Sequence, residues 1–415
     1  MSWRRAEERA GAHATKQHHE RHLYLLFDDW ADGYSVRQVD LSSDDAASDD
    51  AHGRQMAATA CAGDRSLPPA IFRFEAQRGL PAHLAAAFDS KILATQPVSP
   101  AAAAAPLFES HVSVFDVVHR SCLFGPRLVP DRADPIYIPA GGRLFALAGG
   151  TFDLLYPPPP HARAWSWTQL SAPPFERERV ASYAVRPDGT TIFVSFVECA
   201  SSPAATFAFD TAERVLRGGG GGYWRWHGQW VLPFAGRAHF DAELDAWVGL
   251  SRDPDSVGHV CCCDAVATNP DDASGELRCP ARKLSKEKLF SEDPTERHLG
   301  ATLVYMGGRS EFCLVECVFT EDEHHVDCAD EDMSGCDLEE EEDDDPTGDE
   351  RDDCKQQDEQ DVSRPRRYLF RLTTFNLKYD KNADLTTGSS CRVRYYRVPK
   401  DSTEVLLSNP VAFWM

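Results

Sequence analysis

The chain has 415 residues, of which 42% are hydrophobic. This length exceeds what one ordinary core supports, so it predicts either two domains or one large repetitive domain. The formal net charge of −23 is concentrated in residues 321–361, where 22 acidic residues face two basic ones, and the rest of the chain is close to neutral. Because an acidic tract repels phosphate and no basic face is evident elsewhere, we expect no nucleic-acid partner.

Targeting and redox signals place the protein in the cytosol or the nucleus. The first 20 residues are charged and lack the apolar core of an export signal. No apolar run approaches the ~18 residues of a membrane span, so we also expect no membrane partner. The 13 cysteines are an odd number without framework spacing, which in a chain that is not exported is typical of reduced thiols.

The N-terminal part of the chain begins with a polar leader, residues 1–21, that we expect to be disordered. Apolar strand candidates at 22–27 and 34–41, joined by a turn rich in Asp and Gly, predict a β-hairpin. Residues 42–66 hold almost no large apolar side chain, so they cannot offset their own ordering entropy and should form a mobile loop. We expect residues 22–415 to form a single domain.

A short apolar strand preceded by a turn recurs along the rest of the chain. Its copies are residues 90–95, 141–147, 189–195, 244–250 and 310–316. When Leu93, Leu144, Val194, Trp247 and Leu314 are taken as equivalent, their separations are 51, 50, 53 and 67 residues. Kelch blades repeat every ~50 residues, so this period predicts a β-propeller.

A second strand-like segment follows each copy of the first. These segments are residues 111–117, 165–170, 206–211, 259–264 and 368–373. Two hairpins per period are what a four-stranded blade requires, since each blade buries its faces only against its neighbours. We therefore predict an all-β, kelch-like propeller of six four-stranded blades, with Trp30 and Trp247 largely buried. Residues 411–415 should close the ring beside the N-terminal hairpin.

Two stretches interrupt the repeat. Residues 283–290 predict one or two helical turns in a loop. Residues 321–363 are an acidic insertion within the last blade, expected to be disordered because its like charges repel one another. Two interpretations of this insertion stay open: a spacer that keeps the protein soluble, which we prefer, and a docking segment for a basic partner.

Several longer motifs resemble one known family. They are Trp165-Ser-Trp167, Pro173-Pro-Phe175, Ser182–Ile192, Trp230-Val-Leu-Pro-Phe234, Phe240–Leu250, Lys286–Phe290, Glu296–Gly307 and Phe312–Glu316. Together they resemble a plant family, much expanded in grasses, that is known as domain of unknown function 1668. The resemblance runs from about His22 to Met415. It implies a kelch-like fold and, because the family has no established activity, no site residues.

Cysteines and histidines are the first candidates for a metal site. Cys261-Cys-Cys263 lie in a strand, whose successive side chains point to opposite faces, so their sulfurs cannot converge on one metal. Cys313 and Cys317 share a strand face but lie ~13 Å apart, too far for one zinc, and we expect all five to pack as small hydrophobic side chains. A further set could bind a soft cation, yet its spacings match no standard zinc pattern and a solvated loop is preferred: His324, His325, Cys328, Cys336 and Cys354.

Catalytic signatures are missing from the sequence. Ser195 lies in a strand, and no Gly-x-Ser-x-Gly elbow is present. Asp241, Glu243 and Asp245 could do acid–base work, yet they alternate with apolar residues beside a turn, which is typical of the outward face of a hairpin. The glycines at 218–222 are not followed by the Lys-Ser/Thr of a phosphate-binding loop. We therefore assign no catalytic, cofactor-binding or metal residues and expect no cofactor.

Two functional hypotheses stay open. The preferred one is a non-catalytic, monomeric protein-interaction scaffold that presents loops of one propeller face to another protein, whose identity the sequence does not reveal. The alternative is an enzyme or small-ligand binder that uses the central channel. The channel lining discriminates between them, since an enzyme needs converging titratable groups with perturbed pKa values or a metal, whereas a scaffold can have a channel lined with small and apolar residues.

Overall fold

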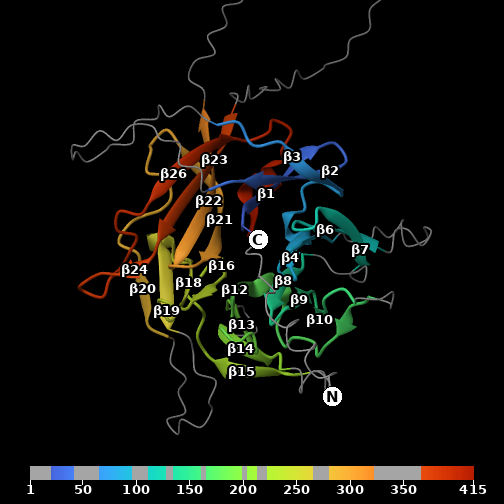
Figure 1. Ribbon diagram of the computed structural model, residues 1–415. Helices are drawn as coiled ribbons and strands as arrows, with labels where there is room; N and C mark the ends of the chain where they lie inside the picture. The colour runs from blue at the N-terminus through green and yellow to red at the C-terminus, as the bar shows by residue number, and fades with distance from the viewer. Residues whose placement is uncertain are drawn as a thin grey trace, which may run out of the picture.

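The computed structural model describes residues 20–41, 65–95, 111–127, 134–159, 165–198, 203–212, 222–264, 280–321 and 366–415. The leader (1–21), the loop (42–66) and the acidic insertion (321–363) expected from the sequence lie outside these ranges except at their ends. Residues 20–21, 65–66 and 321 are described, and Arg65 and Glu321 pair with Tyr396 and Arg366. Within them the chain forms a ring of β-sheets, a β-propeller (Figure 1). None of the helices in these ranges is long and apolar enough to cross a membrane.

The described chain contains six blades of four antiparallel strands each. From its innermost strand to its outermost, blade 1 consists of β27 (Val411–Trp414), β1 (Leu23–Trp30), β2 (Gly33–Val39) and β3 (Ala70–Glu75). In the same order, blade 2 consists of β4 (Leu84–Ala87), β5 (Lys91–Ala94), β6 (His111–Asp116) and β7 (Ser121–Pro126). Blade 3 consists of β8 (Ile136–Ala140), β9 (Arg143–Ala148), β10 (Thr151–Leu155) and β11 (Thr168–Gln169).

The second half of the ring continues in the same order. Blade 4 consists of β12 (Val180–Val185), β13 (Thr191–Phe196), β14 (Ala205–Asp210) and β15 (Trp224–Gly228). Blade 5 consists of β17 (His239–Asp241), β18 (Ala246–Leu250), β19 (Val260–Asp264) and β20 (Arg282–Leu284). Blade 6 consists of β21 (Arg297–Gly307), β22 (Glu311–Glu321), β23 (Arg366–Asn376) and β26 (Arg392–Arg397).

A few short elements decorate this frame. The strand β16 (Gly236–Arg237) pairs with β12 in parallel, and β24 (Lys378–Tyr379) with β25 (Leu385–Thr386) forms a small hairpin between β23 and β26. The helix α2 (Glu404–Ser408) precedes β27, and 3₁₀ turns occupy Pro81–His83, Arg177–Arg179 and Pro254–Ser256. Because each blade has an even number of antiparallel strands, the innermost strands all run in the same direction along the ring axis.

The two ends of the described chain close the ring, as the sequence predicted. The strand β27 pairs antiparallel with β1, in a register that places Leu23 opposite Trp414 and Leu26 opposite Val411. His22 and Met415 extend this pairing with backbone hydrogen bonds of 2.8 and 3.2 Å. Figure 1 shows the C-terminus near the centre of the ring, so the last strand of the chain is the innermost strand of the first blade.

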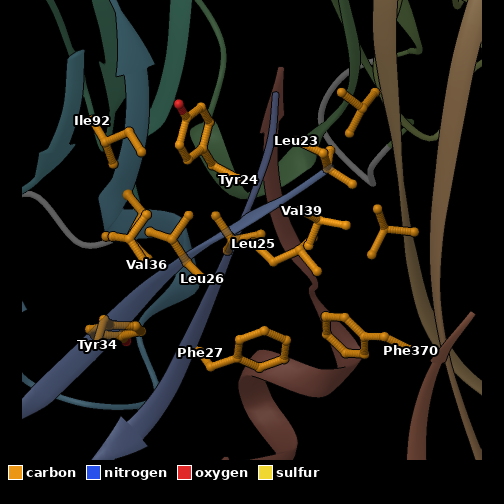
Figure 2. Close-up of a cluster of buried hydrophobic side chains, with 14 of the residues drawn as sticks. Leu23, Tyr24, Leu25, Leu26, Phe27, Tyr34, Val36, Val39, Ile92 and Phe370 are labelled. Carbon is orange, nitrogen blue, oxygen red and sulfur yellow. The ribbon is translucent and has the colours of Figure 1, made fainter. Parts of the chain in front are cut away.

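Apolar side chains fill the space between blades because each sheet is covered on both faces. In β1, consecutive residues from Leu23 to Phe27 are all buried, which is possible only where alternate side chains meet neighbours on opposite sides. Figure 2 shows Phe27 facing Phe370 of blade 6, and their ring centroids lie 4.9 Å apart. On the other side of the same cluster lies Ile92 of blade 2, so blade 1 shares one core with both neighbours (Figure 2).

The predicted period matches the blades. The five residues taken as equivalent all lie in the second strand of a blade, β5, β9, β13, β18 and β22. Four of the second segments coincide with the third strands β6, β14, β19 and β23, but the segment 165–170 was assigned wrongly, because it holds the outermost strand β11 while β10 is the third strand. Trp247 is fully buried, whereas Trp30 is only half-buried.

The helical turns predicted at 283–290 are not formed. Residues 282–284 are the strand β20, which pairs with β19 in a register that places Leu284 opposite Cys261. Residues 286–288, Lys-Glu-Lys, are polar, so a helix here would have no apolar face to bury. The free edge of β19 offers backbone hydrogen bonds to this segment instead. Pairing with the sheet therefore outweighs the local helix propensity.

Candidate functional site

The central channel of the ring is the candidate site. The innermost strands of all six blades, β27, β4, β8, β12, β17 and β21, line a cavity of about 920 Å³. Volumes of roughly 300–1,000 Å³ are typical of small-molecule sites. Ring closure creates this space, because six strands meet around one axis and only their side chains can fill it.

Small residues keep the channel open. Ala85 of β4, Ala181 of β12, Ala301 of β21 and Ala412 of β27 all line the cavity. A large side chain on each of these strands would meet its counterparts across the axis. The walls therefore combine small apolar side chains with polar groups.

Two arginines and a tyrosine form the main polar group. Arg177 begins the 3₁₀ turn that leads into β12, Tyr183 lies within β12, and Arg237 lies on β16. The parallel pairing of β12 with β16 places Tyr183 opposite Arg237, and Ala238 N–H donates to the Tyr183 carbonyl at 2.8 Å. Burial raises the pKa of Tyr183, and the charges of Arg237 and Arg177 oppose that rise, so the two arginines act on the same hydroxyl.

The guanidinium groups of Arg177 and Arg237 are not neutralised by the described protein. Among the described residues, neither group has an ion pair or a side-chain hydrogen bond. Burial lowers the pKa of Arg177, while the charges of Asp134 and Glu178 act in the opposite direction without a direct contact. These two arginines therefore present hydrogen-bond donors and positive charge to the channel.

His239 adds a neutral ring to the same wall. Its Nε2 lies 3.1 Å from the carbonyl oxygen of Leu303, so Nε2–H donates and Nδ1 is left as an acceptor. Burial lowers the pKa of His239 to about 3, with a further contribution from the Arg237 charge, while the bond to Leu303 opposes it. The imidazole is therefore uncharged at neutral pH. Tyr305, whose ring centroid lies 6.1 Å away, also stays neutral because burial and the Asp241 charge raise its pKa to about 12.

Aromatic groups lie elsewhere on the lining. Trp414 of β27 lines the cavity, and its Nε1 is buried with no acceptor among the described residues. Tyr137 of β8 also lines it, but its hydroxyl is hydrogen-bonded to the Thr95 hydroxyl. Trp414 is therefore a donor without a partner, whereas Tyr137 is already satisfied.

Titratable side chains are spread over the lining. Its titratable side chains are Asp89, Tyr137, Arg143, Arg177, Tyr183, Arg237, His239 and Tyr305. Ser182 donates to the Leu232 carbonyl at 3.3 Å and His239 to Leu303, so each is engaged with backbone and they do not form a nucleophile–base pair. In the part of the chain that the structure describes, no three His, Cys, Asp or Glu side chains gather as a metal site would require.

The structure places the cysteine candidates in the core. Cys261 and Cys263 belong to one apolar cluster and Cys262 to another, because they point to opposite faces of β19. Cys313 and Cys317 are fully buried on the same side of β22, between blades 6 and 1. The histidine and cysteine set of the acidic insertion, residues 324–354, lies outside the described residues.

The candidate catalytic residues of the sequence are structural. Ser195 is buried in β13, where its hydroxyl lies 2.7 Å from that of Thr206 and accepts from Leu232 N–H at 3.0 Å. Glu243 and Asp245 are exposed as expected, but Asp241 is fully buried, which corrects its placement on an outward face. Its Oδ1 accepts from Leu244 N–H and from the Ser310 hydroxyl, so this carboxylate holds the β17–β18 turn against blade 6. Of the glycines at 218–222, the structure describes Gly222 alone.

The channel arginines were missed in the sequence. A signal for them exists, because Pro173-Pro-Phe175 and Trp230-Val-Leu-Pro-Phe234 each precede a channel arginine by two or three residues. Both motifs bring the chain from the outside of a blade back to the axis. Their buried ends, Phe175 and Phe234, fix where the following arginine lies.

Comparison with known proteins places the chain in a family. The hydrazine synthase of Kuenenia stuttgartiensis is 11% identical over 73% of this chain, with a TM-score of 0.33, and the chain spans 64% of that protein's length. The periplasmic gluconolactonase PpgL of Pseudomonas aeruginosa is 13% identical over 91% of this chain and 99% of its own, with a TM-score of 0.39. Neither likeness bears on function, and no curated protein matches the sequence. The family model described as "Protein of unknown function (DUF1668)" matches residues 20–395, and the chain therefore belongs to that family.

Proposed function

We propose that the protein is a non-catalytic binding protein that holds a small molecule in the central channel of its propeller. The observation that carries this proposal is the cavity of about 920 Å³, whose walls bear alanines and several polar groups that have no partner among the described residues. Pockets that combine apolar walls with a few convergent polar groups are typical of ligand sites. A channel that served only as the hub of a scaffold would not need Arg177 and Arg237.

Binding is favoured over catalysis because the lining residues that the structure describes form no assembled reactive pair. His239 is neutral and donates to backbone, and Asp89, the acidic side chain of the lining, follows β4 in the turn to β5. His239 is the first residue of β17, whereas Asp89 follows the last residue of β4. Because the innermost strands are parallel, His239 lies toward the opposite mouth of the channel from Asp89, as does Arg177, which precedes β12. An acid and a base that act on one substrate need to face each other, and these groups do not.

A ligand screen with a blocked channel tests the proposal. Thermal unfolding and calorimetry of the full chain with a small-molecule library should yield compounds that bind with one-to-one stoichiometry. Ala181→Trp places a large side chain in the channel and should abolish binding. Ala301→Leu adds a smaller side chain to the lining and should weaken binding. Ala172→Trp, at an exposed position before β12, is the matched control and should bind normally. Equal affinity in Ala181→Trp and in the native chain would place the binding elsewhere and contradict the proposal.

The second candidate is the protein-interaction scaffold that the sequence favoured. It is supported by aromatic side chains on the outermost strands: Phe124 of β7 is 76% exposed and Trp226 of β15 is 59% exposed. Exposed aromatic groups of this size are enriched in protein interfaces. Affinity purification with the native chain and with a Phe124→Ser/Trp226→Ser variant tests this candidate. A stoichiometric partner that the variant loses would support it, and the same set of proteins with both chains would contradict it.

A further inference from the structure

Several arginines outside the channel form ion pairs, whereas two arginines of the channel do not. Outside the channel, Arg37 pairs with Asp29 at 2.5 Å, Arg282 with Asp253 at 2.8 Å and Arg371 with Glu316 at 3.1 Å. Within the channel, Arg177 and Arg237 have no such partner among the described residues.

Arg177 is the arginine that burial affects most. It is half-buried, and its Nε is buried without an acceptor among the described residues. A guanidinium in this position loses part of its hydration without compensation. Arg237 is more exposed on the same wall and adds a second positive charge. An anionic ligand would replace the hydration that the Arg177 guanidinium has lost, and it would be attracted by the positive charges of both arginines.

The charges around the two arginines leave the site positive. Asp134 and Glu178 act on Arg177 from a distance, and both are exposed to solvent, which screens their effect. Asp89 and the carboxylate of Met415 follow innermost strands and lie at the other mouth of the channel, beside Arg143. His239 is neutral, so none of these groups cancels the charge of Arg237. Two positive charges on the wall of a channel favour entry of anions and oppose entry of cations.

Neighbouring groups can complete the recognition of an anion. Tyr183 lies beside Arg237 across the β12–β16 pairing, and its hydroxyl has no hydrogen-bond partner among the described residues. Across the channel, Trp414 Nε1 is a buried donor without an acceptor. Every one of these groups can donate, and an unmatched buried donor costs ~1–3 kcal/mol. Carboxylate and phosphate oxygens are the acceptors that match such a set.

We infer that the channel ligand is a small organic anion whose carboxylate or phosphate group binds Arg177, Arg237 and Tyr183. Its apolar body lies against the alanine walls and the Trp414 ring. This inference rests on the proposed function and adds the class of ligand to it. The two guanidinium groups recognise negative charge, and the cavity volume limits the ligand to the size of a metabolite.

Three probes of one shape test the inference: 1-naphthoate, 1-naphthyl phosphate and the neutral 1-naphthamide. Calorimetry with the full chain should show binding of at least one anion, and the amide should bind at least ~10-fold more weakly. The ranking of the two anions identifies the acidic group. Arg177→Gln and Arg237→Gln should each weaken binding by ~10–100-fold, since a hydrogen bond to a charged group contributes ~1.5–3 kcal/mol. Arg237→Lys should keep part of the affinity.

The control is Arg282→Gln, which removes a positive charge at a surface ion pair on blade 5 and should leave binding unchanged. Because Arg177 and Arg237 have no protein partner among the described residues, their replacement should not alter the melting temperature. Equal binding of amide and anions, no binding of either anion, or full affinity in both Gln variants would overturn the inference. If neutral compounds still bind and Ala181→Trp blocks them, the proposed function stands while the anion class fails. If no compound of any charge depends on the channel, the proposed function fails.

Discussion

Asp28 and Thr403, which are 375 positions apart, are joined by a hydrogen bond of 2.9 Å from the Thr403 N–H to the Asp28 carboxylate. The Thr403 hydroxyl donates to the same carboxylate, and Gly79 N–H does so at 3.2 Å. The Asp28 side chain is fully buried. One carboxylate therefore connects blade 1, the start of blade 2 and the cap of α2 at the point where the ring closes.

Removing this carboxylate should open the seam. Asp28→Ala leaves three donors at the seam without their acceptor, so we expect the free energy of unfolding to fall by about 2–4 kcal/mol. Urea denaturation of the purified chain measures the change. Asp32→Ala, in the exposed turn between β1 and β2, is the control and should change stability by less than ~0.5 kcal/mol. Similar losses in both variants would show that Asp28 does not act through the seam.

A second buried carboxylate, Glu316, should be costly to leave unpaired. It is fully buried, and it accepts from Arg371 at 3.1 Å and from His298 Nδ1 at 2.9 Å. Arg371→Ala should destabilise the protein by about 3–5 kcal/mol, because it leaves a buried charge without its main partner. Adding Glu316→Ala should cost less than the sum of the two single changes. Arg282→Ala, from an exposed pair, should cost at most ~1 kcal/mol. Additive losses in the double variant would be evidence against the pair.

The partly buried imidazole of His239 should make the protein sensitive to acid. Burial lowers its pKa from 6.5 to about 3 in the folded chain. Between these two values the unfolded chain binds a proton that the folded chain does not, so the free energy of unfolding should fall as the pH decreases through this window. His239→Gln keeps a donor for the Leu303 carbonyl and removes the titration. Urea unfolding at a series of pH values should show that the free energy of unfolding of this variant falls less steeply as the pH decreases. The same pH dependence in the variant and in the native chain would show that His239 does not titrate in this way.

Gly300 of blade 6 lies so close to the helix α2 that a side chain at this position should destabilise the protein. A Cβ atom there would collide with the carbonyl oxygen of Ser408, the last residue of α2. Gly300→Ala should therefore destabilise the protein by about 1–3 kcal/mol, since backbone must move to make room. Gly149→Ala is the control, because no atom lies within 4 Å of its added Cβ. Thermal unfolding of the two variants compares them, and equal melting temperatures would contradict the close approach at the seam.

The blades were predictable because their signal is local. A turn followed by an apolar strand is visible in any window of the sequence, and Leu93, Leu144, Val194, Trp247 and Leu314 all occupy the second strand of a blade. The errors in strand assignment fell on outermost strands. Residues 165–170 and 283–290 contribute short edge strands that bury little, and only the neighbouring strands β10 and β19 determine their pairing. The pairing of an edge strand depends on the neighbouring strand, and the sequence of the edge strand alone does not reveal that neighbour.

The sequence by itself determined the fold class, the blade period, the burial of the cysteines in β19 and β22 and the closure of the ring by its last residues. Apolar periodicity is sufficient for these, since each property follows from which faces of a strand must leave water. Only the tertiary structure decided the candidate site. Arg177 and Arg237 are sixty positions apart, they belong to different elements, and no spacing relates them to Trp414. They meet because closing six blades around one axis brings their innermost strands together, and that convergence is a property of the whole ring.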